Sequence, residues 1–139
     1  MAQNVSDVMT IDLVTCPTTA KIADVARLMR DRNIGDVLVT DGGQLRGIVT
    51  DRDIVVRCVA EGVDVNTAAL SEACSEELTT VTSDTPIERA AAIMAEHALR
   101  RLPVVDRGMP VGIVSIGDLA IERDPNSALG RISAQRPNN

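Results

Sequence analysis

The stretch GIVTDRD at residues 47–53 recurs 65 positions later as GIVSIGD at residues 112–118. Each copy has a glycine, two β-branched residues, a hydroxyl residue and, three positions later, an aspartate. The β-branched pair predicts the end of a buried strand, and a hydroxyl residue followed by an acid at this spacing predicts the start of a helix. The sequence therefore predicts a strand-to-helix junction that occurs twice.

The 65-residue offset holds without a gap over nearly the whole chain. Val5-Ser6-Asp7 aligns with Leu70-Ser71-Glu72, and Leu28-Met29 aligns with Ile93-Met94. Similarity this long at one constant spacing indicates an internal repeat. We therefore expect four segments: a first repeat at 1–60, a linker at 61–69, a second repeat at 70–122 and a polar, frayed tail at 123–139.

Each repeat is predicted to have the order β-α-β-β-α. A brief strand leads into a helix whose apolar residues recur at helical spacing over 22–29 and 87–94. Thr85 is expected to cap the second of these helices, with Pro86 as its first residue. The strands that follow are predicted at 37–39, 48–49, 102–105 and 111–114, and the second helices begin near Thr50 and Ser115.

The predicted fold class is α/β. The chain has 139 residues and contains no Phe, Tyr or Trp, so its core must consist of smaller aliphatic side chains. One repeat of about 60 residues with such a core buries too little surface to be stable alone. We therefore expect the two tandem repeats to pack sheet to sheet with pseudo-twofold symmetry.

Charge and composition argue against several classes of partner. Twenty acidic and fourteen basic side chains give a net charge of −6, and no aromatic ring is present on which a nucleic-acid base could stack. No apolar run approaches the roughly 20 residues of a membrane span, and the N-terminal residues do not resemble a secretory signal. We therefore expect a cytoplasmic protein that binds neither nucleic acid nor membranes.

Neither an active site nor a metal site is predicted. The cysteines Cys16, Cys58 and Cys74 are odd in number and match no metal-ligand spacing, so free buried thiols are expected. His97 is the only histidine and has no evident nucleophilic partner. Asp51 and Asp53 are two positions apart at a predicted helix start, so their side chains are expected to diverge and not to form a catalytic acid pair. We expect no catalytic residue, and the protein is predicted not to be an enzyme.

The junction residues themselves allow two interpretations. Thr50 with Asp53, and Ser115 with Asp118, have the spacing of a helix capping box. The same geometry would let the hydroxyl and the helix N-terminus bind a phosphate, while the aspartate accepts hydrogen bonds from a ribose. Under this second interpretation, the glycine that precedes each junction lets the ligand approach the backbone closely. The spacing alone favours capping and leaves both interpretations open.

Taken together, the two repeats resemble a pair of cystathionine-β-synthase (CBS) domains, also called a Bateman module. The resemblance covers about residues 5–120 and rests on an ordered set of motifs that occurs twice. Residues 50–55 followed by Arg57 resemble in particular the small stand-alone bacterial members, including the hypoxic response proteins. The segments that carry the resemblance are 8–10, 14–15, 28–29, 102–106 and the two junctions.

The resemblance implies a regulatory ligand that contains adenosine, such as AMP, ADP, ATP, S-adenosylmethionine or NAD, bound in clefts between the repeats. Asp53 and Asp118 would hold ribose hydroxyls, and Thr50 and Ser115 would bind phosphate. We expect the first-repeat site to be occupied more readily. The implied binding residues are Thr15, Cys16, Pro17, Asp36, Val37, Thr50, Arg52, Asp53, Thr80, Arg100, Arg101, Leu102, Ser115 and Asp118.

The resemblance also implies a homodimer that acts on an unknown protein partner in trans. The small residues at 90–95 would suit close helix packing between two subunits, and they would suit an internal core equally well. The main alternative is an interaction protein of a stress response in which the nucleotide clefts are vestigial.

Overall fold

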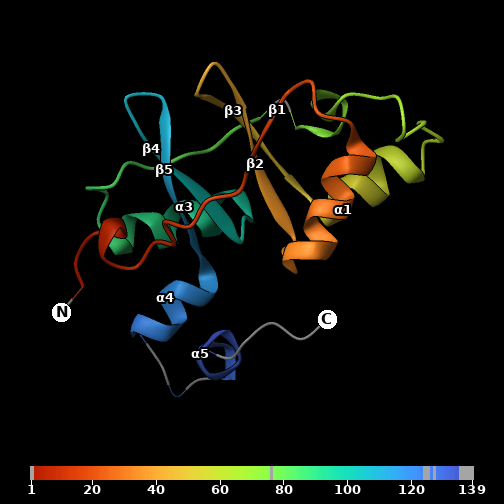
Figure 1. Ribbon diagram of the computed structural model, residues 1–139. Coiled ribbons are helices and arrows are strands. Elements are labelled where there is room, and N and C mark those ends of the chain that lie inside the picture. Colours follow the sequence, from red (N-terminus) through yellow and green to blue (C-terminus); the bar gives the residue numbers. More distant parts are fainter. Residues whose placement is uncertain (1, 76, 124–125, 127, 135–139) are drawn as a thin grey trace. The chain divides into compact units, whose positions relative to one another are not determined.

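The computed structural model describes residues 2–75, 77–123, 126 and 128–134. The chain divides into two compact units (Figure 1), which we name after the repeat that supplies most of each. The first-repeat unit is Val14–Leu78, and the second-repeat unit combines Met1–Leu13 with Thr79–Asn139. The segment that leads into each repeat therefore belongs to the unit of the other repeat. The predicted sheet-to-sheet packing concerns the relative placement of the units and stays a prediction.

The first-repeat unit is a three-stranded sheet covered on one face by helices. Its elements are β1 (Thr15–Pro17), α1 (Ile22–Arg32), β2 (Asp36–Asp41), β3 (Gln44–Thr50), α2 (Asp51–Asp53), the π-helix η2 (Ile54–Val59) and the 3₁₀-helix η3 (Leu70–Ala73). β1 pairs parallel with β2, and β2 pairs antiparallel with β3. Residues of α1 and η2, including Val25 and Cys58, pack on alternate strand residues such as Val37 and Val39.

The second-repeat unit has the same plan with a smaller sheet. Its elements are the 3₁₀-helix η1 (Val5–Asp7), α3 (Ile87–His97), β4 (Arg101–Asp106), β5 (Met109–Ser115), α4 (Ile116–Arg123) and α5 (Ala128–Ser133). β4 and β5 are antiparallel, and the strand expected near residue 81 is reduced to one parallel bridge between Val81 and Val104. The β-α-β-β-α prediction is thus confirmed, with this one strand shortened.

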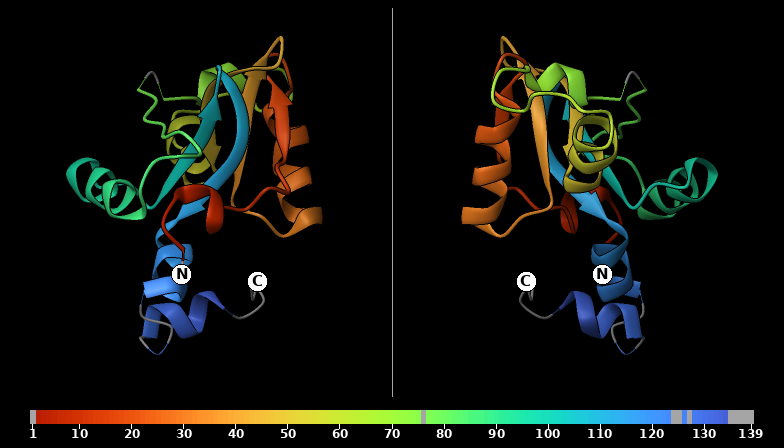
Figure 2. Two further views of the ribbon diagram at one scale, coloured as in Figure 1. Left: turned by 90° about the vertical axis from the view of Figure 1, so that its left-hand side faces the viewer. Right: turned by 90° about the vertical axis from the view of Figure 1, so that its right-hand side faces the viewer.

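Two local predictions were wrong. Pro86, not Thr85, precedes the first turn of α3, and the Thr85 hydroxyl accepts a hydrogen bond from the Thr82 N–H at 3.0 Å. The tail is not frayed throughout, because α5 forms within it and packs beside α4 (Figure 2). Residues 124–125, 127 and 135–139 of the predicted tail lie outside the described residues.

Both hairpins turn through two residues with positive φ. Gly42 and Gly43 have φ values of 60° and 82°, and Arg107 and Gly108 have values of 56° and 79°. Positive φ at both central residues matches the right-handed twist of the flanking strands. Arg107 is the costlier choice because it carries a side chain in the left-handed region.

A sulfur-bearing side chain from each lead-in segment covers a glycine of the other repeat. A Cβ placed on Gly112 would lie 2.5 Å from the Sδ of Met9, and one on Gly47 would lie 3.3 Å from the Sγ of Cys74. Met9 and Cys74 are themselves aligned by the 65-residue offset. The Cβ position of each glycine is therefore filled by a lead-in segment, so the glycine has a packing role here, and the close approach of a ligand stays a prediction.

We predict that Gly112→Ala lowers the free energy of unfolding by about 1–3 kcal/mol, because the added methyl group overlaps Met9. Gly47→Ala is the matched control and should cost less, since Cys74 lies farther away. Urea unfolding of both variants measures the difference. Met9→Ala should partly relieve the effect in a double variant, and strictly additive losses would contradict the contact.

Candidate ligand-binding site

The strand-to-helix junction of each unit is closed by a pair of reciprocal hydrogen bonds. The Thr50 Oγ1 accepts a bond from the Asp53 N–H at 3.1 Å, and the Asp53 Oδ2 accepts one from the Thr50 N–H at 2.8 Å. Ser115 and Asp118 make the same bonds at 3.1 and 2.9 Å. The capping interpretation is therefore confirmed in both repeats. The Oδ1 atom of each aspartate takes no part in the capping box.

Strand register brings several predicted site residues to the same end of each sheet. Asp36 lies opposite Thr50, and Arg101 lies opposite Ser115. The Asp51 N–H donates to the Gly35 carbonyl at 2.9 Å, and the Ile116 N–H donates to the Arg100 carbonyl at 2.9 Å. The two junctions thus have the same backbone framework.

The first strand of each repeat lies beside the same sheet end. Thr15 in β1 pairs with Leu38, two residues from Asp36, and Thr15 and Pro17 are exposed. In the second-repeat unit, Thr80 is exposed and directly precedes the bridge residue Val81. The polar site residues predicted for each repeat therefore lie within the unit of that repeat.

Three predicted site residues place their side chains in the cores instead. Cys16, Val37 and Leu102 are buried among apolar residues. Because side chains alternate along a strand, a run of adjacent residues cannot all face one ligand.

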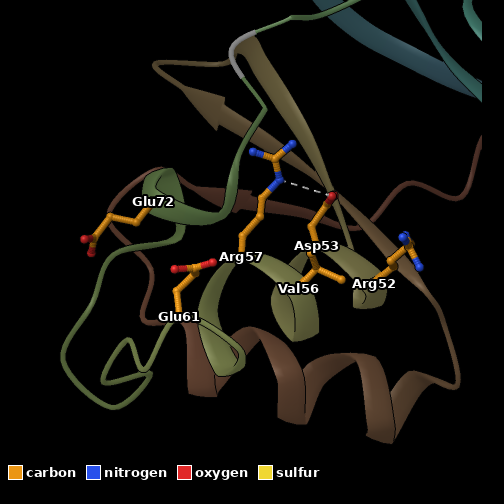
Figure 3. Close-up of a pocket in the computed structure, with 6 residues that line it drawn as sticks. All are labelled: Arg52, Asp53, Val56, Arg57, Glu61 and Glu72. Atoms are coloured by element: carbon orange, nitrogen blue, oxygen red, sulfur yellow. Dashed lines mark ion pairs between the residues drawn. The ribbon is translucent and has the colours of Figure 1, made fainter.

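A groove of about 620 Å³ lies along α2 and η2, the helical segment that follows the first-repeat junction (Figure 3). The Arg57 side chain points towards Asp53, and its Nε lies 3.6 Å from the Asp53 Oδ1. The groove is lined by Arg52, Asp53, Val56, Arg57, Glu61 and Glu72. Arg57 could have been found from its helical spacing to Asp53. Glu72 could not, because it comes from a distant segment.

The three thiols are free, and their surroundings raise the pKa of each. Burial raises the pKa of Cys16, and burial together with the nearby Asp53 carboxylate raises the pKa of Cys58 and Cys74. Glu72 adds to the effect on Cys58. A raised pKa keeps a thiol protonated and poorly nucleophilic at neutral pH. Among the described residues, no three His, Cys, Asp or Glu side chains are grouped so that they could hold a metal ion.

Comparison with protein families matches the CBS domain twice, at residues 5–59 and 70–123. Both matches include the junction and its capping box. The chain belongs to the CBS domain family and carries a tandem pair of these domains. CBS pairs are regulatory modules in general rather than catalytic ones, and they typically bind adenosine compounds.

Known proteins of similar length share this arrangement. The CBS domain-containing protein YhcV of Bacillus subtilis is 40% identical over 127 residues, which cover 91% of this chain and 90% of that protein. Hypoxic response protein 1 of Mycobacterium tuberculosis is 33% identical over 115 residues, covering 82% of this chain and 80% of that protein. The predicted similarity to hypoxic response proteins is thus confirmed.

A solved structure of the cytosolic domain of the Mg²⁺ channel MgtE in complex with ATP also superposes on this chain. The TM-score is 0.73 at 27% sequence identity, and the match covers 84% of this chain and 47% of that one.

In the part of the present chain that the structure describes, no helix is long and apolar enough to cross a bilayer.

We predict that none of the three thiols reacts with a neutral aromatic disulfide reagent in the native protein at pH 7, because burial keeps them protonated. All three should react after denaturation in guanidinium chloride, which serves as the control. Counting the released thiolate by absorbance measures both states. Fast stoichiometric modification of a native thiol would contradict this assignment.

Proposed function

We propose that the chain is a cytoplasmic regulatory sensor that binds an adenosine-containing ligand at its strand-to-helix junctions. The observation that carries the proposal is the capping box, which uses only one oxygen of each aspartate. The Oδ1 atoms of Asp53 and Asp118 remain outside the box and can accept hydrogen bonds from ribose hydroxyls. A CBS pair typically binds ligands of this class, and the MgtE domain that superposes on this chain was solved in complex with ATP.

Each junction supplies a hydroxyl and a carboxylate for different parts of the ligand. In this proposal the Thr50 and Ser115 hydroxyls donate hydrogen bonds to a phosphate. The guanidinium groups that neutralise its charge are those of Arg52, Arg100 and Arg101. An adenine has no aromatic partner in this chain. It is held instead by aliphatic side chains and by the backbone near 15–17 and 80–82.

The proposed output is regulatory. A ligand shifts the protein between conformations only as far as it binds one of them more tightly, and that shift is passed to a partner protein in trans. AMP, ADP, ATP, S-adenosylmethionine and NAD all carry the ribose that the aspartates would bind, so each is a candidate ligand.

One observation favours a second candidate function, an interaction protein of a stress response with vestigial ligand sites. The capping boxes by themselves account for the hydroxyl residue and the aspartate of both junctions. The similarity to Hypoxic response protein 1 suggests the stress-response setting. This alternative needs no ligand at either junction.

We further propose that the protein is a homodimer whose two subunits meet through η2 of the first-repeat unit. Val55, Val56 and Val59 on η2 are 57%, 45% and 63% exposed, an apolar face suited to a second copy. The segment 90–95 has both buried and exposed residues. Ala90 and Met94 lie in the core of the second-repeat unit, and the alanines at 91, 92 and 95 are exposed.

We predict that AMP or a related adenosine compound at about 100 times its Kd raises the melting temperature by about 5–10 °C. The double variant Asp53→Asn/Asp118→Asn should lose the shift. Asp24→Asn, in the first turn of α1, is the matched control and should keep it. Because the chain lacks Tyr and Trp, a 260 nm band in purified protein would also reveal bound nucleotide. No shift with the full ligand panel would favour the interaction protein.

We predict that Val56→Asp/Val59→Asp converts a dimer into a monomer of 14.8 kDa, because two carboxylates would be buried in the contact. Light scattering after size exclusion measures the mass. Ile11→Asp, at a residue that is 74% exposed on the other unit, is the control and should leave the dimer intact. A wild-type monomer, or an unchanged double variant, would contradict the proposed interface.

A further inference from the structure

The two carboxylate oxygens of Asp53 have different neighbours. Its Oδ2 accepts the Thr50 N–H at 2.8 Å within the capping box. Its Oδ1 lies 3.6 Å from the Nε of Arg57, whose side chain points towards it (Figure 3). The oxygen that the proposed function assigns to the ribose therefore already faces a guanidinium. A ribose hydroxyl and this guanidinium are both donors, and they need the lone pairs of the same oxygen.

The ion pair between Arg57 and Asp53 is weak enough for a ligand to break. Its distance of 3.6 Å is too long for a hydrogen bond, and the Arg57 side chain is 47% exposed. Ion pairs of this kind contribute little to stability and are screened by salt. A ligand can therefore displace Arg57, but it loses part of its own binding free energy in doing so.

The groove next to the junction leaves a displaced Arg57 among other carboxylates. Glu61, four residues after Arg57, and Glu72 of η3 both line this groove together with Arg57 (Figure 3). The guanidinium can move away from Asp53 and stay close to negative charge. The loss that the ligand meets is then limited to the difference between two sets of weak ion pairs.

The second repeat has the opposite charge at the corresponding position. Glu122 is aligned with Arg57 by the 65-residue offset, and it follows Asp118 by four residues as Arg57 follows Asp53. Its Oε1 accepts the Ala2 N–H at 3.2 Å. A carboxylate cannot form an ion pair with Asp118. The two junctions therefore share a capping box and differ in the residue one helical turn beyond the aspartate.

We infer that Arg57 competes with the ribose of the ligand for Asp53 and so lowers the affinity of the first-repeat junction in a salt-dependent way. The second-repeat junction has no such competitor at the aligned position. Occupancy of the first-repeat junction therefore rises with ionic strength. This inference rests on the proposed function and adds to it a residue that regulates one of the two sites.

The test is calorimetric titration of the full chain with adenosine, which is uncharged and has little salt dependence of its own. The Asp118→Asn background confines binding to the first-repeat junction. The affinity should rise about two- to three-fold between about 0.02 M and about 0.5 M NaCl, because salt screens the competing ion pair. Arg57→Gln in this background should bind about three-fold more tightly at low salt and lose the salt dependence.

The matched control is Arg27→Gln, which breaks another exposed arginine–aspartate pair. The Arg27 Nη1 lies 2.9 Å from the Oδ1 of Asp24 on α1. This variant should leave both the affinity for adenosine and its salt dependence unchanged. Thermal unfolding checks that each variant is folded, and Arg57→Met replaces Arg57→Gln if that variant is not.

The outcomes separate the inference from the proposed function. Weaker adenosine binding in Arg57→Gln, or a salt dependence that persists in it, overturns the inference, while the proposed function stands. If the Asp118→Asn background binds no adenosine, the inference requires Arg57→Gln to restore binding, and failure to do so overturns it as well. If neither adenosine nor AMP binds the wild-type chain, the proposed function and the inference both fail.

Discussion

Two reciprocal hydrogen bonds, between a hydroxyl residue and an aspartate three positions later, determine where the last strand of each repeat stops and its helix starts. They satisfy backbone groups at the helix start that would otherwise lack partners, and they fix the aspartate carboxylate in one orientation. The end of the strand, the start of the helix and the position of the aspartate carboxylate follow from this constraint. The capping box and the proposed ligand site therefore use the same residues, which is why the motif alone could not separate the two roles.

Much of the fold could be predicted because it repeats. A constant 65-residue offset, helical spacing at 22–29 and 87–94, and two glycine turns were enough to place the main helices and hairpins. The lead-in exchange could not be predicted, because it depends on contacts between residues far apart in the chain, such as Val5 with Thr85 and Leu70 with Ala20. The strand at Val81 was overestimated because one parallel bridge leaves no signal that differs from that of a short strand.

The candidate site was predictable in its polar residues and less so in its apolar ones. Thr50, Asp53, Ser115 and Asp118 lie where their spacing places them. The resemblance implies Cys16 and Leu102 as parts of strand segments that border the ligand, and alternation along each strand turns their side chains into the cores.

The exchange of lead-in segments bears on how such a chain can arise by duplication. A single repeat with its own lead-in would lack the residue that covers its strand glycine, since Met9 covers Gly112 and Cys74 covers Gly47. Two separate copies of one ancestral repeat could complete each other only by trading these segments. Joining the copies in one gene would preserve every such contact and remove the entropy cost of bringing two chains together. The tandem chain is, in this sense, a domain-swapped dimer made covalent.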